Sequence, residues 1–179
     1  MANKHGRAIR FHESTVREMG RTATGVRGMT LDETGDDEVI GMICIKDPEK
    51  ETVMVVSEQG YGKRSEIEDY RITNRGGKGV KTLNITEKTG NLVAIKSVTD
   101  ENDLVIINKS GITLRMKVAD VRIMGRATQG VRLINLEKRN DEIASVCKVL
   151  SETESDSSNS ENIDSASEIN EAEASETTE

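Results

Sequence analysis

Apolar residues gather in short runs that are rich in valine and isoleucine and are separated by polar turns. The runs are VIGMICI (39–45), TVMVVS (52–57), LVAIKSV (92–98) and DLVIINKSG (103–111). Runs of this composition, bounded by Gly, Asp and Asn, are typical of antiparallel strands. The polar turns KDPEKE and TDEND divide them into pairs and predict two hairpins. No window has a helical period over about ten positions, so we expect an all-β fold.

The strand pattern belongs to a longer repeat. The segments GVRGMTL, GVKTLNI and GVRLINL begin at Gly25, Gly79 and Gly130, so the copies are offset by 54 and 51 residues. VREMGRTATGVR in the first copy and VRIMGRATQGVR in the third agree closely over 12 positions. Tandem four-stranded units of about 50 residues predict a propeller-like ring of blades.

The first residues enter this repeat inside a strand. Residues 1–3 align with 55–57 and 106–108, which lie in the apolar runs of the second and third copies. We therefore expect a partial ring of about two and a half blades and interpret the chain as a C-terminal part of a longer protein. Because repeat arrays lose stability when terminal units lack neighbours, the piece alone is expected to be weakly stable.

Composition changes abruptly at Ser151. Residues 151–179 contain ten acidic residues, eight serines and no Lys or Arg, so we expect a disordered tail. All 25 Lys and Arg of the chain, but only 22 of its 32 Asp and Glu, lie in residues 1–150. The predicted blade domain, 1–150, is therefore about +3 and the tail −10. This opposition predicts an anionic partner and a tail that competes with it, or a tail that merely improves solubility.

Catalytic, metal and nucleotide sites find little support. His5 and His12 have no companions at metal or triad spacing, and Cys44 and Cys147 are interpreted as small core residues. The glycine-rich stretch NRGGKGVK, residues 74–81, lacks the spacing of a phosphate-binding P-loop. We expect no cofactor, no metal and no catalytic residue, and no apolar run is long enough to cross a membrane. A cytoplasmic protein is expected.

Basic residues recur at equivalent positions of the three copies. Each copy contributes four positions in register, and three lysines lie beside them. These candidate DNA-binding residues are Arg10, Arg17, Arg21 and Arg27; Arg64, Arg71, Arg75 and Lys81; Arg115, Arg122, Arg126 and Arg132; and Lys63, Lys78 and Lys117.

Equivalent positions of a ring fall on equivalent parts of its surface, so the register predicts a basic track along the rim. Such a track suits the phosphates of duplex DNA, bent around the edge, with glycines beside the arginines admitting phosphate oxygens. Three aromatic residues in the whole chain disfavour single-stranded nucleic acid. Two alternatives remain open: arginines that pair with blade carboxylates, and a ring that binds another protein.

The repeat resembles a known family. VREMGRTATGVRGM, GYGKR (60–64), ITNRGGKGVKTL and VRIMGRATQGVRLI are similar to successive blades of the C-terminal β-pinwheel domain found in the A subunit of DNA gyrase. The resemblance covers residues 1 to about 150, and acidic tails are usual in that family. NRGGKG resembles the gyrase A box, Q-[RK]-R-G-G-K-G, although Thr73 and Asn74 precede Arg75 where the box has Gln and a basic residue.

The resemblance implies a domain without catalytic residues that wraps duplex DNA and supports ATP-dependent negative supercoiling by the holoenzyme. The partners would be duplex DNA, the B subunit of gyrase and a second copy of its A subunit. ATP and Mg²⁺ would be used on the catalytic core and the B subunit, outside this chain. The family's active-site tyrosine is not carried over to Tyr61 or Tyr70. The equivalent domain in the A subunit of topoisomerase IV is the alternative within the same class.

Overall fold

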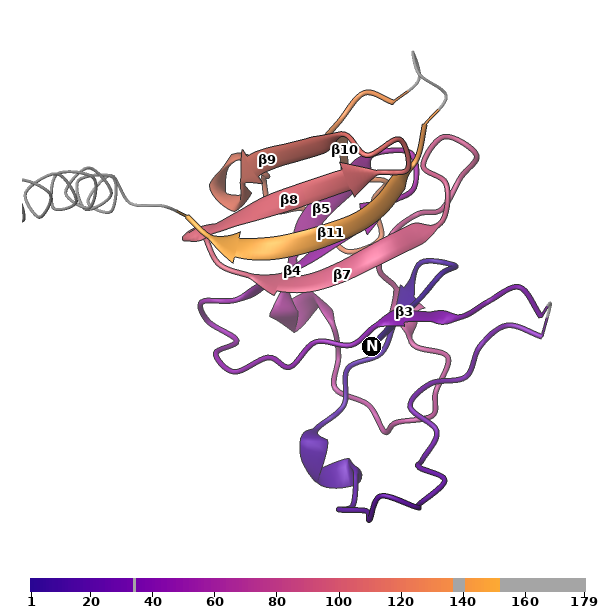
Figure 1. Ribbon diagram of the computed structural model, residues 1–179. Coiled ribbons are helices and arrows are strands. Elements are labelled where there is room, and N and C mark those ends of the chain that lie inside the picture. Colours follow the sequence, from indigo (N-terminus) through magenta and orange to yellow (C-terminus); the bar gives the residue numbers. More distant parts are fainter. Residues whose placement is uncertain (34, 137–140, 152–179) are drawn as a thin grey trace, which may run out of the picture. The chain divides into compact units, whose positions relative to one another are not determined.

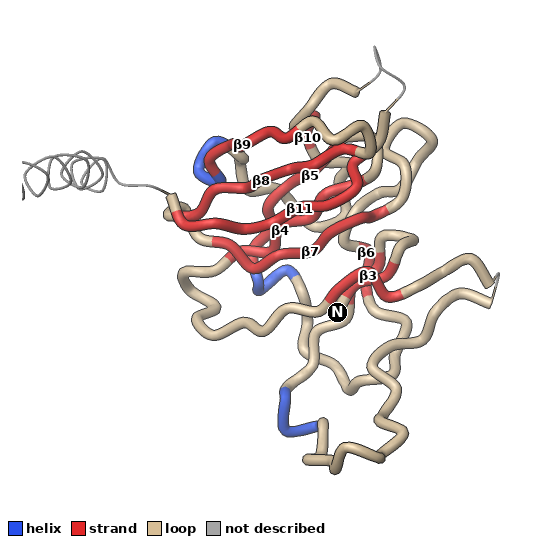
Figure 2. The backbone as a smooth tube through the Cα atoms, viewed as in Figure 1, coloured by secondary structure: helices blue, strands red, loops and turns tan. Residues whose placement is uncertain are grey.

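The computed structural model describes residues 1–33, 35–136 and 141–151 (Figure 1). Its strands are β1 (Ala2–Asn3), β2 (Arg7–Ala8), β3 (Val39–Gly41), β4 (Thr52–Ser57), β5 (Tyr61–Glu66), β6 (Val80–Lys81), β7 (Leu92–Val98), β8 (Asn102–Asn108), β9 (Thr113–Lys117), β10 (Val131–Arg132) and β11 (Ile143–Leu150). The helices of this part of the chain are single 3-10 turns: η1 (Glu13–Thr15), η2 (Ile67–Asp69) and η3 (Val118–Asp120) (Figure 2). The predicted all-β fold is confirmed.

The chain divides into two units, Met1–Val149 and Leu150–Glu179. Nearly all of the second unit, and with it the predicted disordered tail, lies outside the described residues. Within the described ranges, no helix has the length and apolar character that a membrane crossing requires.

The three sheets of the first unit are built by strand exchange between neighbouring repeats. The first sheet has the order β3-β1-β2-β6, the second β10-β5-β4-β7, and the third, as far as it is described, β11-β8-β9. Strand β6 follows β5 in the chain but pairs with β2, with Arg7 opposite Lys81. Strand β10 pairs in the same way with β5, with Tyr61 opposite Arg132. Each repeat therefore completes the sheet of the repeat before it.

The predicted hairpins are wrong in their pairing. Strand β3 belongs to the first sheet and β4 to the second, while β7 pairs with β4 and β8 begins the third sheet. The hairpins are instead β1–β2, β4–β5 and β8–β9. Their turns end at Gly6, Gly60 and Gly111, where φ is +76°, +80° and +85°. The polar segments KDPEKE and TDEND carry the chain from one sheet to the next.

Strand β4 separates two apolar cores because its side chains alternate between the two faces of the second sheet. Val53 and Val55 join one core with residues of the first repeat, whereas Met54 and Val56 join the other with residues of the third. The expectation that the cysteines are core residues is wrong, since both Cys44 and Cys147 are exposed.

Glycines let the exchanged strands approach the hairpins closely. Gly79 has a φ of +69°, and a Cβ there would lie 2.4 Å from the carbonyl oxygen of Ala8. Gly130 has a φ of +80°, and a Cβ there would lie 2.5 Å from the carbonyl oxygen of Gly62. Only glycine fits both the conformation and the space. These two members of the repeated GV motif therefore hold sheets together and are packed away from an external phosphate.

Candidate nucleic-acid interface

One column of arginines is free for a ligand. Arg17, Arg71 and Arg122 each lie two residues after the last residue of a 3-10 turn, so the same local structure presents all three. Each is exposed. Within the described chain, none of the three side chains makes a hydrogen bond or an ion pair. A cation without an internal partner keeps its full charge for an external anion.

A second exposed column lies on or beside the exchanged strands. Lys81 ends β6 and donates from Nζ to Asn84 Oδ1 at 3.2 Å. Arg132 ends β10, and its Nε and Nη2 donate to Tyr61 Oη at 3.2 and 3.0 Å. Its guanidinium carbon lies 5.5 Å from the centroid of the Tyr61 ring, which fits a cation–π contact. Arg27, the first-copy member, is exposed.

Tyr61 contacts two basic side chains, an arrangement that the repeat pattern did not reveal. Besides Arg132, the Nζ of Lys88 lies 5.6 Å from the centroid of its ring. The tyrosine thus gathers two cations at the edge of the second sheet. Arg7 and Ile112 stand in its column in the other copies, so no recurring aromatic marks the position. The strand exchange that brings Tyr61 to Arg132 was not predicted either.

The column that begins with Arg10 is internal in the first two copies. Arg10 Nη1 donates to the carbonyl oxygens of Ile67 and Tyr70, at 3.0 and 3.2 Å. Arg64 is only 4% exposed, and its Nη1 donates to the carbonyl of Val118 at 3.3 Å and to Asp100 Oδ1 at 2.7 Å. These arginines bind the 3-10 turn of the next repeat. Arg64 is therefore not on the surface where the sequence placed it.

Arg115, the third member of that column, is exposed, and its Nε donates to Asp103 Oδ2 at 2.8 Å. This contact has the form of the alternative in which blade arginines pair with carboxylates. Lys117 and Lys78 are also exposed.

Lys63 is fully buried, contrary to the expected surface position. Its Nζ donates to the carbonyl oxygen of Gly125 at 2.7 Å and also to that of Arg126. Burial lowers the pKa of the lysine to about 8, and nearby Asp69 opposes that shift. The side chain therefore joins β5 to Gly125 and Arg126 of the third repeat from the interior of the domain.

The members of the last column, Arg21, Arg75 and Arg126, differ in their exposure and in their partners. Arg21 is exposed and unpaired within the described residues, whereas Arg75 and Arg126 are half-buried. Arg75 Nε and Nη1 donate to the carbonyls of Thr15 and Arg27, at 3.0 and 3.2 Å. Arg126 repeats this pair of bonds on the second copy. The predicted single track is therefore two exposed columns supported by arginines that join the repeats.

One group of side chains, on described residues, brings together the ligand types of a cation site. Ligand atoms of His5, Asp32 and Asp37 all lie within 4.8 Å of one another. Asp37 Oδ2, however, already accepts from Asn3 Nδ2 at 2.6 Å and from the backbone N–H of Asp32 at 3.1 Å. The group ties Asp32 and Asp37 to the first hairpin turn.

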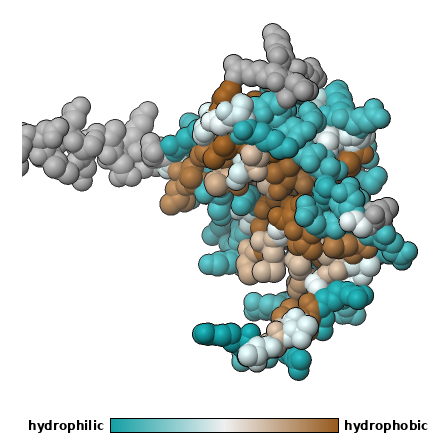
Figure 3. Space-filling model, turned by 45° about the vertical axis from the view of Figure 1, so that its right-hand side comes forward, coloured by the Kyte–Doolittle hydropathy of each residue, from teal (hydrophilic) through white to brown (hydrophobic). Residues whose placement is uncertain are grey.

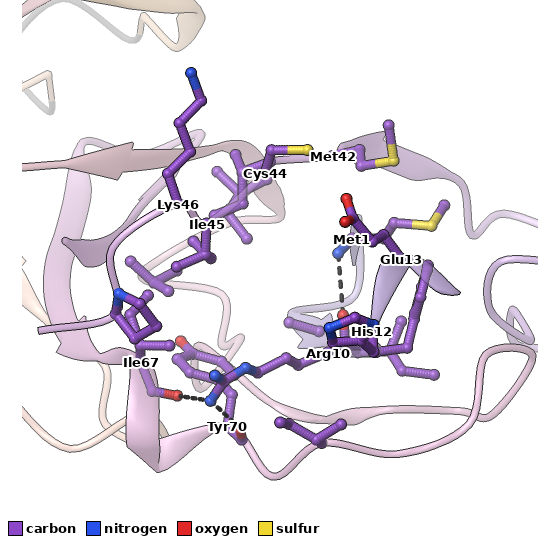
Figure 4. Close-up of a pocket in the computed structure, with 18 of the residues that line it drawn as sticks. Met1, Arg10, His12, Glu13, Met42, Cys44, Ile45, Lys46, Ile67 and Tyr70 are labelled. Carbon is purple, nitrogen blue, oxygen red and sulfur yellow. Dashed lines mark hydrogen bonds between the residues drawn. The ribbon is translucent and has the colours of Figure 1, made fainter. Parts of the chain in front are cut away.

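A mostly apolar cavity of about 750 Å³ lies beside the first sheet (Figure 4). Arg10 crosses it to reach η2, and Lys46 projects away from it (Figure 4). The amino group of Met1 donates to the carbonyl of Ile9 at 3.0 Å, and burial lowers its pKa. With its cations engaged or turned away, this cavity is poorly suited to phosphate. On the face of the molecule shown in the space-filling view, apolar side chains lie among hydrophilic ones (Figure 3).

Consecutive sheets that exchange strands, with exposed arginines recurring in register, define a propeller-type repeat domain with a cationic surface. The chain belongs to the family described as the DNA gyrase C-terminal domain, beta-propeller, whose model matches residues 1–46, 51–99 and 102–147. The chain is 47% identical over 161 residues to the A subunit of DNA gyrase from Staphylococcus aureus (strain NCTC 8325 / PS 47). It is 52% identical over 136 residues to the same protein from strain MRSA252.

The first match covers 90% of this chain but 18% of the relative's length. The second covers 76% and 15%. Among solved structures, a DNA gyrase A C-terminal domain matches with a TM-score of 0.74 and 29% identity, covering 83% of this chain and 49% of that chain. The C-terminal domain of DNA topoisomerase IV matches with a TM-score of 0.76 and 24% identity, over 83% and 45%, which supports the fold alone.

Proposed function

We propose that this domain binds duplex DNA through its phosphates and wraps it along the exposed arginine columns, as the C-terminal part of a gyrase A protein. The observation that carries the proposal is the column Arg17, Arg71 and Arg122. The same 3-10 turn presents each of them, and each lacks an internal partner in the described chain. Recurring cations without base-reading side chains suit phosphate contacts and weak sequence preference.

In this proposal the domain works within a holoenzyme. It presents a wrapped DNA segment for ATP-dependent negative supercoiling, and its protein partners are the B subunit of gyrase and a second copy of the A subunit. ATP and Mg²⁺ act on those other parts, and the location is the cytoplasm. Membership in the gyrase family supports this role. The acidic tail, which lies outside the described residues, competes with DNA for the same cations.

Two measurements on the 179-residue chain test the proposal. Fluorescence anisotropy with labelled duplexes of unrelated sequence should give similar affinities that fall steeply with salt. Relaxation of a closed circular plasmid by a type I topoisomerase in the presence of the chain should then leave a linking-number difference, because wrapped DNA retains its crossings. A folded chain that ignores duplex DNA at low salt would exclude the proposal and favour a protein partner.

The topoisomerase IV alternative concerns the parent protein. Binding without a linking-number change is the result expected of a domain that contacts DNA but does not wrap it. The sequence identity to the gyrase A protein favours wrapping, and this assay separates the two.

A further inference from the structure

The two exposed columns described above lie in or beside rim loops, where a rim loop is the segment from the end of the 3-10 turn to the basic residue of the GV motif. The first rim loop, 15–27, contains Arg17 and Arg21, and the second, 69–81, contains Arg71 and Lys78. The first loop follows η1 and extends away from the sheets (Figure 1). Residues 16–25 are all exposed, so bonds at the neck of this loop, meaning its first and last residues, matter to its conformation.

In each of these two loops, one arginine of the following repeat bonds to both the first and the last residue and so closes the neck of the loop. Arg75 donates to the carbonyls of Thr15 and Arg27, the first and last residues of the first rim loop. Arg126 Nε donates to the carbonyl of Asp69 at 3.0 Å, and its Nη1 to that of Lys81 at 2.9 Å. These are the first and last residues of the second rim loop. The same pair of bonds therefore occurs twice, shifted by one repeat.

Backbone hydrogen bonds accompany each closure. The N–H of Thr30 donates to the carbonyl of Gly77 at 2.9 Å, and in the next pair of repeats the N–H of Asn84 donates to that of Thr128 at 3.1 Å. The N–H of Gly76 donates to the carbonyl of Gly28 at 2.7 Å. The glycine-rich turn of one repeat is thus built against the repeat before it, and this amide is used internally.

We propose that Arg75 and Arg126 are positioning residues, which close the rim loop of the preceding repeat and so fix the cations that contact DNA there. This inference rests on the proposed function. A planar guanidinium can bridge two carbonyls in fixed geometry, whereas a lysine ammonium on a flexible stem cannot hold the same fork. Closing the neck removes conformational freedom before DNA arrives, which reduces the ordering cost of binding.

Arg21 and Arg122 provide matched comparisons. Arg21 occupies the same column as Arg75 and Arg126 but has no carbonyl partner in the described chain. Arg122 precedes Arg126 by four residues and is likewise unpaired among the described residues. Within the described residues, neither side chain joins two carbonyls, so Arg122→Lys is the control for the exchange measurement on DNA-free chain, and Lys50→Gln, an exposed charge outside the register, is the control for DNA affinity.

The first arm of the test is hydrogen exchange by mass spectrometry on the DNA-free 179-residue chain. Arg126→Gln and Arg126→Lys should both speed amide hydrogen exchange in residues 70–80 about tenfold. This is the factor expected when a hydrogen bond to a charged group is lost. The reporting amides are Thr73, bonded to the carbonyl of Arg10, and Gly76. In both Arg126 variants, exchange in the first rim loop should stay unchanged. In the control variant Arg122→Lys, exchange should stay unchanged in both rim loops.

The second arm is DNA affinity. Arg126→Lys should weaken duplex binding about as much as Arg126→Gln, roughly tenfold, while Lys50→Gln, which removes an exposed charge outside the register, retains wild-type affinity. Wild-type behaviour of Arg126→Lys in both arms would overturn the proposal and make the arginine an ordinary phosphate contact. Faster exchange with unchanged affinity would also overturn it, since the loop would then be closed without positioning the cations.

Two further outcomes can be told apart from a failure of loop closure. If the wild-type chain binds no DNA, the proposed function fails, and with it the positioning role, while the exchange arm still reports whether Arg126 closes the loop. If Arg126→Gln unfolds, exchange rises in the core strand β4 as well, and the milder Arg126→Lys decides the matter. Unchanged exchange in residues 70–80 for a folded Arg126→Lys chain contradicts the closure itself.

Discussion

The guanidinium of Arg64 lies 3.3 Å from the carbonyl oxygen of Val118, joining the second repeat to the 3-10 turn of the third. Arg10 makes the equivalent bond to the carbonyl of Ile67 at 3.0 Å. One arginine in each of the first two repeats therefore secures the next repeat, which gives the strand-exchanged sheets a second connection. This role concerns stability and leaves the DNA contacts to other columns.

Replacing Arg64 by alanine should destabilise the fold strongly. The change leaves the buried hydroxyl of Thr52 without its donor, removes one of the two donors to the carbonyl of Val118 and opens space in the core, so we expect a loss of about 2–4 kcal/mol. Urea unfolding of the 179-residue chain measures it. Arg71→Ala, an exposed cation from the same repeat, should change the free energy of unfolding by less than about 0.5 kcal/mol. Equal effects of the two variants would refute the internal role of Arg64.

Gly130→Ala should be more damaging than Gly25→Ala, although both glycines have positive φ. The strained backbone conformation costs about 1–2 kcal/mol in either case. At Gly130 a Cβ would also meet the carbonyl of Gly62 at 2.5 Å, while at Gly25 it would meet no described residue within 4 Å. Thermal unfolding should therefore show a clearly lower Tm for Gly130→Ala. A Tm shift as large for Gly25→Ala would contradict the packing of β10 described above.

Lys63 gives the fold a pH dependence with a definite sign. Its pKa is about 8 when folded and near 10.5 when unfolded, so between these values the unfolded chain binds more protons at this lysine. Stability contributed by Lys63 therefore rises by about 2–3 kcal/mol as the pH rises from 8 to 10. Urea unfolding should show the difference between wild type and Lys63→Met growing in favour of wild type over this window. Parallel curves would mean that the lysine is solvated.

Shortening the chain at Ser151 should strengthen DNA binding. The tail carries ten negative charges, which compete with phosphates for the rim cations. The gain should shrink as salt is added, because screening weakens both attractions. A chain of full length whose ten tail carboxylates are replaced by amides is the matched control and should behave like the shortened one. Unchanged affinity at low salt would leave the tail without a competing role.

The sequence predicts the fold class well because the repeat is strong in the sequence itself. The offsets of 54 and 51 residues between Gly25, Gly79 and Gly130 indicate tandem units, and valine-rich runs indicate strands. Partner choice between strands is a different matter. VIGMICI and TVMVVS both have the character of strands, but neither pattern says that β3 pairs with β1 and β4 with β5.

The arginine columns show the same limit at the level of side chains. Arg64 and Arg71 recur equally well in the sequence, yet Arg64 is 4% exposed, while Arg71 is exposed and unpaired within the described chain. What separates them is the neighbouring repeat, because the carbonyl that accepts from Arg64 comes from a residue far along the chain. A recurring residue marks an equivalent environment, which is as readily an interface between repeats as a ligand surface.

The salt dependence of duplex binding, compared between two triple variants, shows whether the free arginine column contacts DNA. Arg17→Gln/Arg71→Gln/Arg122→Gln removes the free column, and Lys46→Gln/Lys50→Gln/Lys148→Gln removes the same charge from exposed positions outside the register. Loss of three phosphate contacts should make the plot of log affinity against log salt less steep, with its slope smaller in magnitude by about 2–3, and should weaken binding strongly at low salt. The lysine variant should stay near wild type. Equal slopes and affinities for the two variants would contradict the claim that these arginines contact DNA.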